Sequence, residues 1–421
     1  MVKTKNFGIF LLISIFLMPY LFSIPYRIDQ ILIPVTVIYC LIFYKIEERF
    51  LYLSLLLLVF SFVLPLFSTL INLKTLSFIG VYDMIKETQN ILKPFIYLLF
   101  GYFLVRYFRL GESDLHKILK LLIVITFIVS FSTFFTHVST GSSENFLNDF
   151  MVQYYHLHPG VSNMLRYPGL LMRPAPAGIY FIFFSFLCIV FNYPYEYLIL
   201  VVMTGILSNT KVFWFSLPFF FIIVILNSKN PKKIFQFLLG LIVVLIVFNF
   251  LFGENLTKSF EFVFGVIKAD PLGGRGENFV AANINDLLNN YPIFGVGFTK
   301  TKLMYQSISY GTWDSLFFYE LAFGGLIGLI TKTIIFFLIF YVPFKEEKFN
   351  IRLSVTILLI NILLAGLGTT SFYQERIGDI MFVFFGFYYA IKFEQKSFTK
   401  FEKTLFPNTT NLNNHSFNAP S

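Results

Sequence analysis

The chain has 421 residues, of which 57% are hydrophobic and only 13% are charged. Its 59 Phe and 24 Tyr exceed what the core of a water-soluble domain of this length could bury, so the composition excludes a soluble enzyme and predicts a chain solvated by lipid. The formal net charge of +9 arises from Lys and Arg scattered in short groups between apolar runs. Without one continuous basic stripe, this charge argues against nucleic acid as a partner.

The N-terminal segment resembles a secretory signal peptide, because Lys3 and Lys5 precede an apolar run. No small-x-small cleavage site follows, since residues 20–24 read Tyr-Leu-Phe-Ser-Ile. We therefore expect this first helix to be retained. Both cysteines, Cys40 and Cys188, lie inside apolar runs, and no Cys/His cluster has metal-ligand spacing, so we predict neither a metal site nor a cofactor.

Apolar stretches follow one another along the chain, each near the length needed to cross about 30 Å of hydrocarbon. These stretches cover roughly residues 6–24, 30–45, 50–72, 91–108, 117–137, 176–193, 195–208, 210–227, 233–252, 316–343, 352–370 and 376–393. Only the short polar segment 208–211 separates 195–208 from 210–227, which leaves this pair in doubt. The pattern predicts an all-α integral membrane protein with about twelve transmembrane helices.

The Lys and Arg residues in the short connections indicate the orientation. Most of them fall on the side of the N-terminus, whereas the opposite short turns contain little more than Arg27, Lys211 and Arg376. By the positive-inside rule, we expect both termini to lie on the cytoplasmic side of an inner membrane. Three longer segments are then extracytoplasmic: about 73–92, 138–175 and 253–314.

The end of the chain has a different composition from the rest. Residues 406–421 are rich in Asn, Thr and Ser and lack periodicity, which predicts a disordered cytoplasmic tail. Residues 1–405 then form one polytopic membrane domain.

Two of the extracytoplasmic loops, 138–175 and 253–314, are roughly 38 and 62 residues long, far more than a helix connection needs. In the first, Arg166 and Arg173 bracket a turn just before an apolar stretch. A guanidinium group binds phosphate oxygens in a bidentate manner, so a diphosphate or an anionic lipid head group suits these residues. The alternative is that each arginine only anchors a helix end at lipid phosphates.

The second loop contains Arg275, then apolar residues at helical spacing up to Tyr291, then the element Pro-Ile-Phe-Gly-Val-Gly at 292–297. This pattern predicts an amphipathic helix on the membrane surface that ends at the proline. Asp314 follows at the mouth of the next apolar stretch, where a carboxylate is either a helix cap or a catalytic group.

Glu320 lies one to two turns further into that apolar stretch and needs a partner or a role there. The glycines that follow favour close helix packing; they are Gly324, Gly325 and Gly328.

These residues together resemble the bacterial O-antigen polymerase and O-antigen ligase superfamily, most strongly across about 160–178 and 270–330. The first part is an arginine, a glycine and prolines before a helix, matched by Arg166, Gly169, Pro174, Pro176 and Gly178. The second is an arginine and a Pro-x-x-Gly-x-Gly element, matched by Arg275 and 292–297. The third is a polar residue before a glycine-rich helix, matched by Asp314 and 323–328. Ligases of the superfamily carry His at this polar position, so Asp314 favours the polymerase branch.

The resemblance implies a fold like that of C-type glycosyltransferases and a metal-independent, inverting transfer. The donor would be a growing glycan on undecaprenyl diphosphate, and the acceptor a lipid-linked repeat unit of O-antigen, capsule or exopolysaccharide. Arg166, Arg173 and Arg275 would bind the diphosphate, and Asp314, with Glu320 in reserve, would accept the proton of the acceptor hydroxyl. Membrane lipid and a chain-length regulator protein would be further partners.

Two alternatives remain open from the sequence. One is O-antigen ligase. The other is a flippase or transporter for lipid-linked oligosaccharides, which would share the helices and the basic residues. A carrier normally has related halves and polar residues through its midplane helices. Here no related halves are visible, and the charges within apolar stretches are few: Glu320, Lys332 and Asp379.

Overall fold

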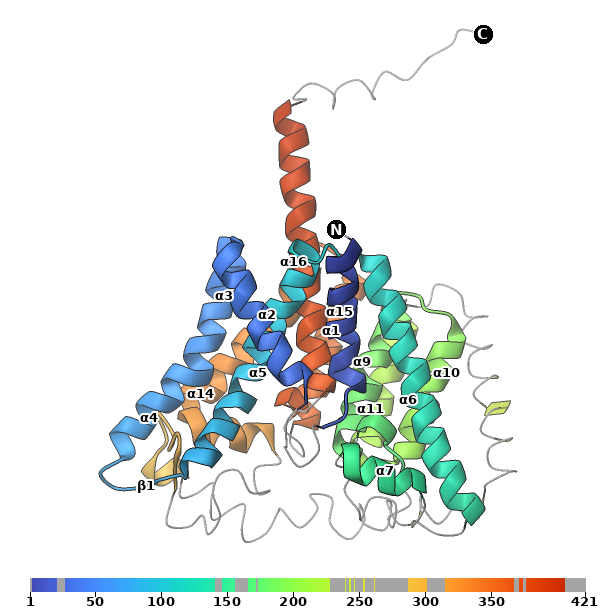
Figure 1. The fold of residues 1–421 in the computed structure, drawn as a ribbon, viewed down its shortest axis with the longest axis horizontal. Helices are drawn as coiled ribbons and strands as arrows, with labels where there is room; N and C mark the ends of the chain where they lie inside the picture. The colour runs from blue at the N-terminus through green and yellow to red at the C-terminus, as the bar shows by residue number, and fades with distance from the viewer. Residues whose placement is uncertain are drawn as a thin grey trace.

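The computed structural model describes residues 2–20, 27–140, 146–155, 166–171, 173–227, 239, 242–243, 246, 253, 261, 287–300, 315–366, 371–373 and 376–405 (Figure 1). This part of the chain is almost entirely helical. Its α-helices are α1 (Val2–Leu17), α2 (Asp29–Phe43), α3 (Glu48–Leu58), α4 (Leu64–Asn72), α5 (Val81–Arg106), α6 (Glu112–Thr140), α7 (Phe146–Tyr155), α9 (Pro174–Val190), α10 (Tyr195–Ser208), α11 (Lys211–Asn227), α14 (Leu316–Tyr341), α15 (Phe349–Ala365) and α16 (Ile377–Leu405).

Shorter elements connect these helices. A π-helical turn, η1 (Val59–Val63), joins α3 to α4. Three 3-10 turns are η2 (Gly169–Leu171), η3 (Val342–Phe344) and η4 (Ser371–Tyr373). Two short strands, β1 (Ser77–Phe78) and β2 (Thr299–Lys300), pair in antiparallel orientation.

The helices confirm the predicted all-α class. Each predicted apolar stretch within the described residues coincides with a helix, whereas 233–252 lies almost wholly outside them. The pair left in doubt forms two helices, because Asn209 ends α10 in the left-handed conformation with φ of 41°. Within the predicted outer segment 73–92, helix α5 already begins at Val81, ten residues before the predicted apolar stretch 91–108.

Three helical segments in the described part are long and apolar enough to cross a membrane: Glu48–Asn72, Glu112–Thr140 and Leu316–Phe344. The other apolar helices have 10–17 residues, as in α10 with 14. At 1.5 Å per residue, α10 extends only about 21 Å, which is less than the hydrocarbon thickness of about 30 Å. These features are those of an all-α membrane protein, and the total of twelve spans stays a prediction.

The centre of the bundle is the contact between α5 and α16. A Cβ atom at Gly101 would lie 2.1 Å from the backbone oxygen of Val383, and one at Gly386 would lie 2.0 Å from that of Leu98. Glycine at both positions therefore lets the two backbones touch, a form of packing common between helices in membranes.

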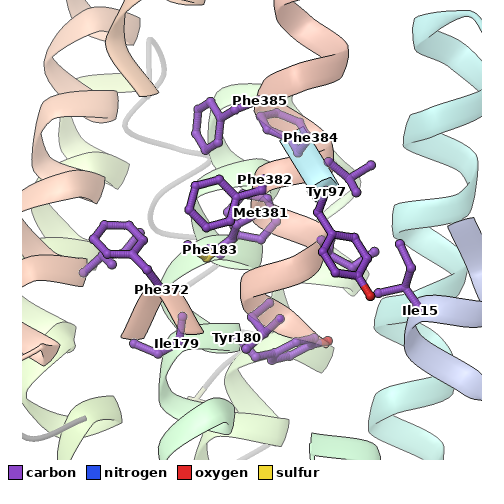
Figure 2. Close-up of a cluster of buried hydrophobic side chains, with 14 of the residues drawn as sticks. Ile15, Tyr97, Ile179, Tyr180, Phe183, Phe372, Met381, Phe382, Phe384 and Phe385 are labelled. Carbon is purple, nitrogen blue, oxygen red and sulfur yellow. The ribbon is translucent and has the colours of Figure 1, made fainter. Parts of the chain in front are cut away.

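Aromatic side chains fill the space around this contact. Figure 2 shows Phe382, Phe384 and Phe385 of α16 packed with Phe183 of α9 and Phe372 of η4. Phe340 of α14 extends the cluster, with its ring centroid 5.6 Å from that of Phe372. The N-terminus and the far end of α16 lie at the same end of the bundle, and α16 projects beyond the other helices (Figure 1).

Candidate functional site

Helix α14 is broken at Gly325, where the backbone has φ of 61° and ψ of −160°. Only glycine adopts this conformation readily. The break divides the predicted span 316–343 into two helical pieces, although the segment Leu316–Phe344 as a whole is long and apolar enough to cross a membrane. A Cβ at Gly324 would lie 3.2 Å from Leu64 Cδ2, which is a tight contact, whereas one at Gly328 would lie 3.4 Å from the same atom, which is an ordinary contact.

The segment 292–297 fills the break with its backbone. The N–H groups of Leu326 and Ile327, which begin the second piece, donate to the carbonyls of Pro292 and Ile293 at 2.8 and 3.3 Å. The carbonyl of Ala322, near the end of the first piece, accepts from Val296 N at 2.7 Å. Backbone polar groups freed by a broken helix must find such partners inside a membrane.

The same segment is held on its other side by α4. Asn72 Nδ2 donates to the carbonyl of Gly295 at 3.0 Å, and the Ser68 hydroxyl donates to the carbonyl of Phe294. Phe298 N donates to Thr69 Oγ1 at 2.7 Å. Three polar side chains of α4, which are buried, therefore clamp the segment against the break.

Steric contacts explain two glycines of this segment. Gly295 has φ of 67° and Gly297 has φ of 60°. A Cβ at Gly295 would lie 2.4 Å from the oxygen of Ala322, and one at Gly297 would lie 2.2 Å from the oxygen of Pro65. Backbone atoms surround both positions, so no larger residue fits without displacing α4 or α14.

A buried ion pair bridges the two pieces of α14. Lys332 Nζ lies 2.5 Å from Glu320 Oε2, with both side chains almost fully buried. In a continuous helix these residues would be about 18 Å apart, so their contact depends on the break. Tyr373 of η4 donates its hydroxyl to Glu320 Oε1 and accepts from Lys332 Nζ at 3.4 Å.

The polar network continues to α5. Tyr319 OH donates to Glu87 Oε2 at 2.9 Å, and the Tyr319 ring lies 5.0 Å from that of Tyr373. Glu87 is 3% exposed and Glu320 is 2% exposed. Two buried carboxylates, joined through two tyrosines, therefore lie beside the break.

Sequence reasoning missed Glu87, Tyr319 and Tyr373. Glu87 lies in the predicted outer segment 73–92, in the part that the structure assigns to α5. No signal in the sequence pairs a tyrosine at 373 with a carboxylate at 320, because a 3-10 turn brings them together.

Arg166 and Arg173 flank a turn that packs against α6. Arg166 is partly buried, and burial lowers the pKa of its guanidinium from the ordinary value because the charged form loses water. Arginine still remains protonated at neutral pH. Arg173, in contrast, is exposed at the start of α9. The predicted pair thus consists of one partly desolvated cation and one solvated cation.

The turn itself is fixed by close contacts. Tyr167 N donates to the carbonyl of Leu207 at 3.0 Å, and its hydroxyl lies 3.1 Å from His137 Nδ1. Gly169 has φ of 55°, and a Cβ there would lie 2.5 Å from Ser130 Oγ. This explains the glycine of the predicted Arg-x-x-Gly motif.

The predicted site residues are only partly assembled in the described structure. Arg275 and Asp314 lie outside the described residues. Ser315, which follows Asp314, donates its hydroxyl to the carbonyl of Gly366 at 3.0 Å. Helix α14 carries Glu320, and helix α6 packs on the turn that follows Arg166. These two helices lie on opposite sides of α1 and α16 in Figure 1, so the structure does not bring Glu320 and Arg166 together.

A second buried cluster involves the two arginines predicted in outward turns. Arg27 and Arg376 are both fully buried. Arg27 Nε lies 2.9 Å from Asp29 Oδ1, and its Nη2 lies 3.2 Å from Asp379 Oδ2. Arg376 Nη2 donates to the carbonyl of Met18 at 3.0 Å. These contacts join the end of α1 to α2 and α16. Both arginines therefore stabilise the packing of these helices and are not solvated turn residues.

No group of three potential metal-ligating side chains occurs among the described residues. No family model matches the chain, and neither a curated protein nor a solved structure is similar to it.

Proposed function

We propose that the protein is a polysaccharide repeat-unit polymerase of the bacterial inner membrane. It would transfer a growing glycan from undecaprenyl diphosphate to a lipid-linked repeat unit on the extracytoplasmic face. The observation that carries the proposal is the contact between 292–297 and the break at Gly325, because these are two of the motifs on which the family resemblance rests.

This contact has a consequence for catalysis. The segment 292–297 lies in the same predicted loop as Arg275, 17 residues after it, and the first piece of α14 begins two residues after Asp314. The contact between 292–297 and α14 therefore limits the movement of the chain after Arg275 relative to the chain at Asp314. Fixed positive charge toward a leaving diphosphate and a fixed carboxylate toward a hydroxyl are what an inverting transfer requires.

The roles of the two carboxylates differ in this proposal. Asp314 accepts the proton of the acceptor hydroxyl. Glu320 already faces Lys332 and accepts a hydrogen bond from Tyr373, so both of its carboxylate oxygens are engaged within the protein. We assign Glu320 to holding the two pieces of α14 together.

One observation favours a second candidate, a carrier of lipid-linked oligosaccharides. Broken helices and buried ion pairs occur at the substrate sites of secondary transporters, and α14 has both features. A carrier would move a lipid-linked unit across the membrane without forming a glycosidic bond.

Deletion of the gene distinguishes these functions by the glycans that remain. Loss of a polymerase leaves single repeat units on the final acceptor and no ladder of longer chains. Long chains retained on undecaprenyl diphosphate would instead identify a ligase, and single units retained on the cytoplasmic side would identify a carrier.

We predict the topology from the distribution of Lys and Arg between the connections and from the N-terminus and the far end of α16, which lie at the same end of the bundle. Reporter fusions at residues 112, 230 and 347 should be cytoplasmic, and fusions at 155, 285 and 373 should be extracytoplasmic. A cytoplasmic signal at 285 would place the Arg275 loop on the wrong side and refute the site.

Substitution of the arginines tests diphosphate binding. Arg166→Lys and Arg275→Lys should each slow polymer formation by about 10²–10³, because lysine cannot reproduce the bidentate contact to a transition-state charge. Arg173, exposed on the same turn, is an additional diphosphate contact in this proposal, and Arg173→Lys should slow polymer formation less than Arg166→Lys. The measurement is the chain-length distribution of the polysaccharide at equal protein abundance. A wild-type distribution in Arg275→Lys would mean that Arg275 only anchors the chain at lipid phosphates and does not bind the diphosphate.

A further inference from the structure

A pocket lies at the end of the bundle from which α16 projects, away from the proposed catalytic face (Figure 1). It encloses about 230 Å³ between α3, η3 and α16. Most of its lining is apolar, contributed by Leu53, Leu338, Val342, Pro343, Tyr389 and Phe393. None of the roles described above involves this pocket.

Charged side chains complete the lining. Arg49, Lys345 and Lys392 contribute three cations from three separate segments, against the single carboxylate of Glu346. Arg49 and Lys345 are exposed, whereas Lys392 is partly buried and pairs with Glu347. With Lys392 paired to Glu347, Arg49 and Lys345 face the one carboxylate of Glu346, so the pocket combines one excess positive charge with an apolar lining.

Two further lysines follow Lys392 in the sequence. Lys392 belongs to α16, and the sequence places Lys396 and Lys400 at four-residue intervals further along that helix. Residues four apart in a helix lie on one face. Basic clusters next to a membrane-spanning helix attract anionic lipid surfaces.

We propose that this pocket binds an anionic phospholipid. Its phosphate would contact Arg49 and Lys345, and an acyl chain would cover the apolar side chains of Leu338 and Val342. A guanidinium and an ammonium are suited to a phosphate monoanion or diester. A free phosphate ion would leave the apolar lining in water, so the lining favours a lipid as the ligand.

Lipid-binding measurements on the purified full-length protein test this proposal. The protein is placed in nanodiscs of phosphatidylcholine that contain a defined fraction of phosphatidylglycerol or cardiolipin, and the lipids retained on the protein are counted by native mass spectrometry. The wild-type protein should retain the anionic lipid in preference to phosphatidylcholine. Each neutralised cation should reduce that preference about fivefold, so Arg49→Gln/Lys345→Gln should reduce it about 25-fold.

Two controls make the result specific. Lys348→Gln removes an exposed cation nearby that does not line the pocket, and its preference should remain that of the wild type. Arg49→Lys keeps the charge and should keep most of the preference. An unchanged preference in the double variant, an equal loss in Lys348→Gln, or displacement of the lipid by millimolar inorganic phosphate would each overturn the proposal.

Discussion

Gly325→Ala should sharply lower the thermal stability and abundance of the protein, whereas Gly328→Ala should leave both near the wild-type level. The backbone of Gly325 has φ of 61° and ψ of −160°, a region that costs other residues about 1–3 kcal/mol. A Cβ there would also lie 2.3 Å from the carbonyl oxygen of Ile293. That oxygen accepts the hydrogen bond from Ile327 N, so moving it opens the contact that fills the break.

Gly328 provides the matched control because it lies in the same helix. Its Cβ would lie 3.4 Å from Leu64 Cδ2, an ordinary contact with a flexible side chain. Alanine is also favoured over glycine in a helix by about 1 kcal/mol. Thermal unfolding of the two purified variants in detergent gives the comparison. Equal melting temperatures would mean that the break at Gly325 is not a fixed part of the fold.

Lys332→Met should destabilise the protein more than the double variant Glu320→Gln/Lys332→Met. Removing one partner of a buried ion pair leaves an uncompensated charge and typically costs about 3–5 kcal/mol. Here Glu320 is 2% exposed, so water cannot replace the lost ammonium. In the double variant no charge remains, and Tyr373 can still donate its hydroxyl to the amide oxygen of the glutamine.

The same pair of variants tests the role of Glu320. If Glu320 only holds the two pieces of α14 together, the double variant should regain both stability and polymer formation. A double variant that folds as well as the wild type but makes no polymer would identify Glu320 as the catalytic base. Equal stability of the single and double variants would show that the ion pair does not contribute to the fold.

Hydropathy predicted the positions of the helices because a helix in lipid needs apolar side chains along its whole length. The boundary between α10 and α11 illustrates this, since the polar segment 208–211 was visible in the sequence and Asn209 does end the helix. The break at Gly325 was not visible. A hydropathy window averages the hydropathy of the side chains and carries no information on the backbone angle φ. An apolar stretch that contains a pair of glycines is therefore predicted as one continuous span.

Pairings between distant residues could not be predicted for a related reason. Arg27 was expected in a short outward turn, but Asp379, 352 residues away, makes its burial possible. Glu320 was expected to need a partner, and Lys332 was noted as a charge in the same run. Only the break in α14 at Gly325 brings them into contact.

The most direct test of the central claim is reconstitution of the purified protein in liposomes with a repeat unit linked to undecaprenyl diphosphate. The account predicts glycans of two or more units on the lipid and release of undecaprenyl diphosphate, with undiminished rate in excess EDTA. Arg275→Ala at equal protein content should reduce that rate by about 10²–10³. Movement of the lipid-linked unit across the bilayer with no new glycosidic bond would contradict the account and identify a carrier.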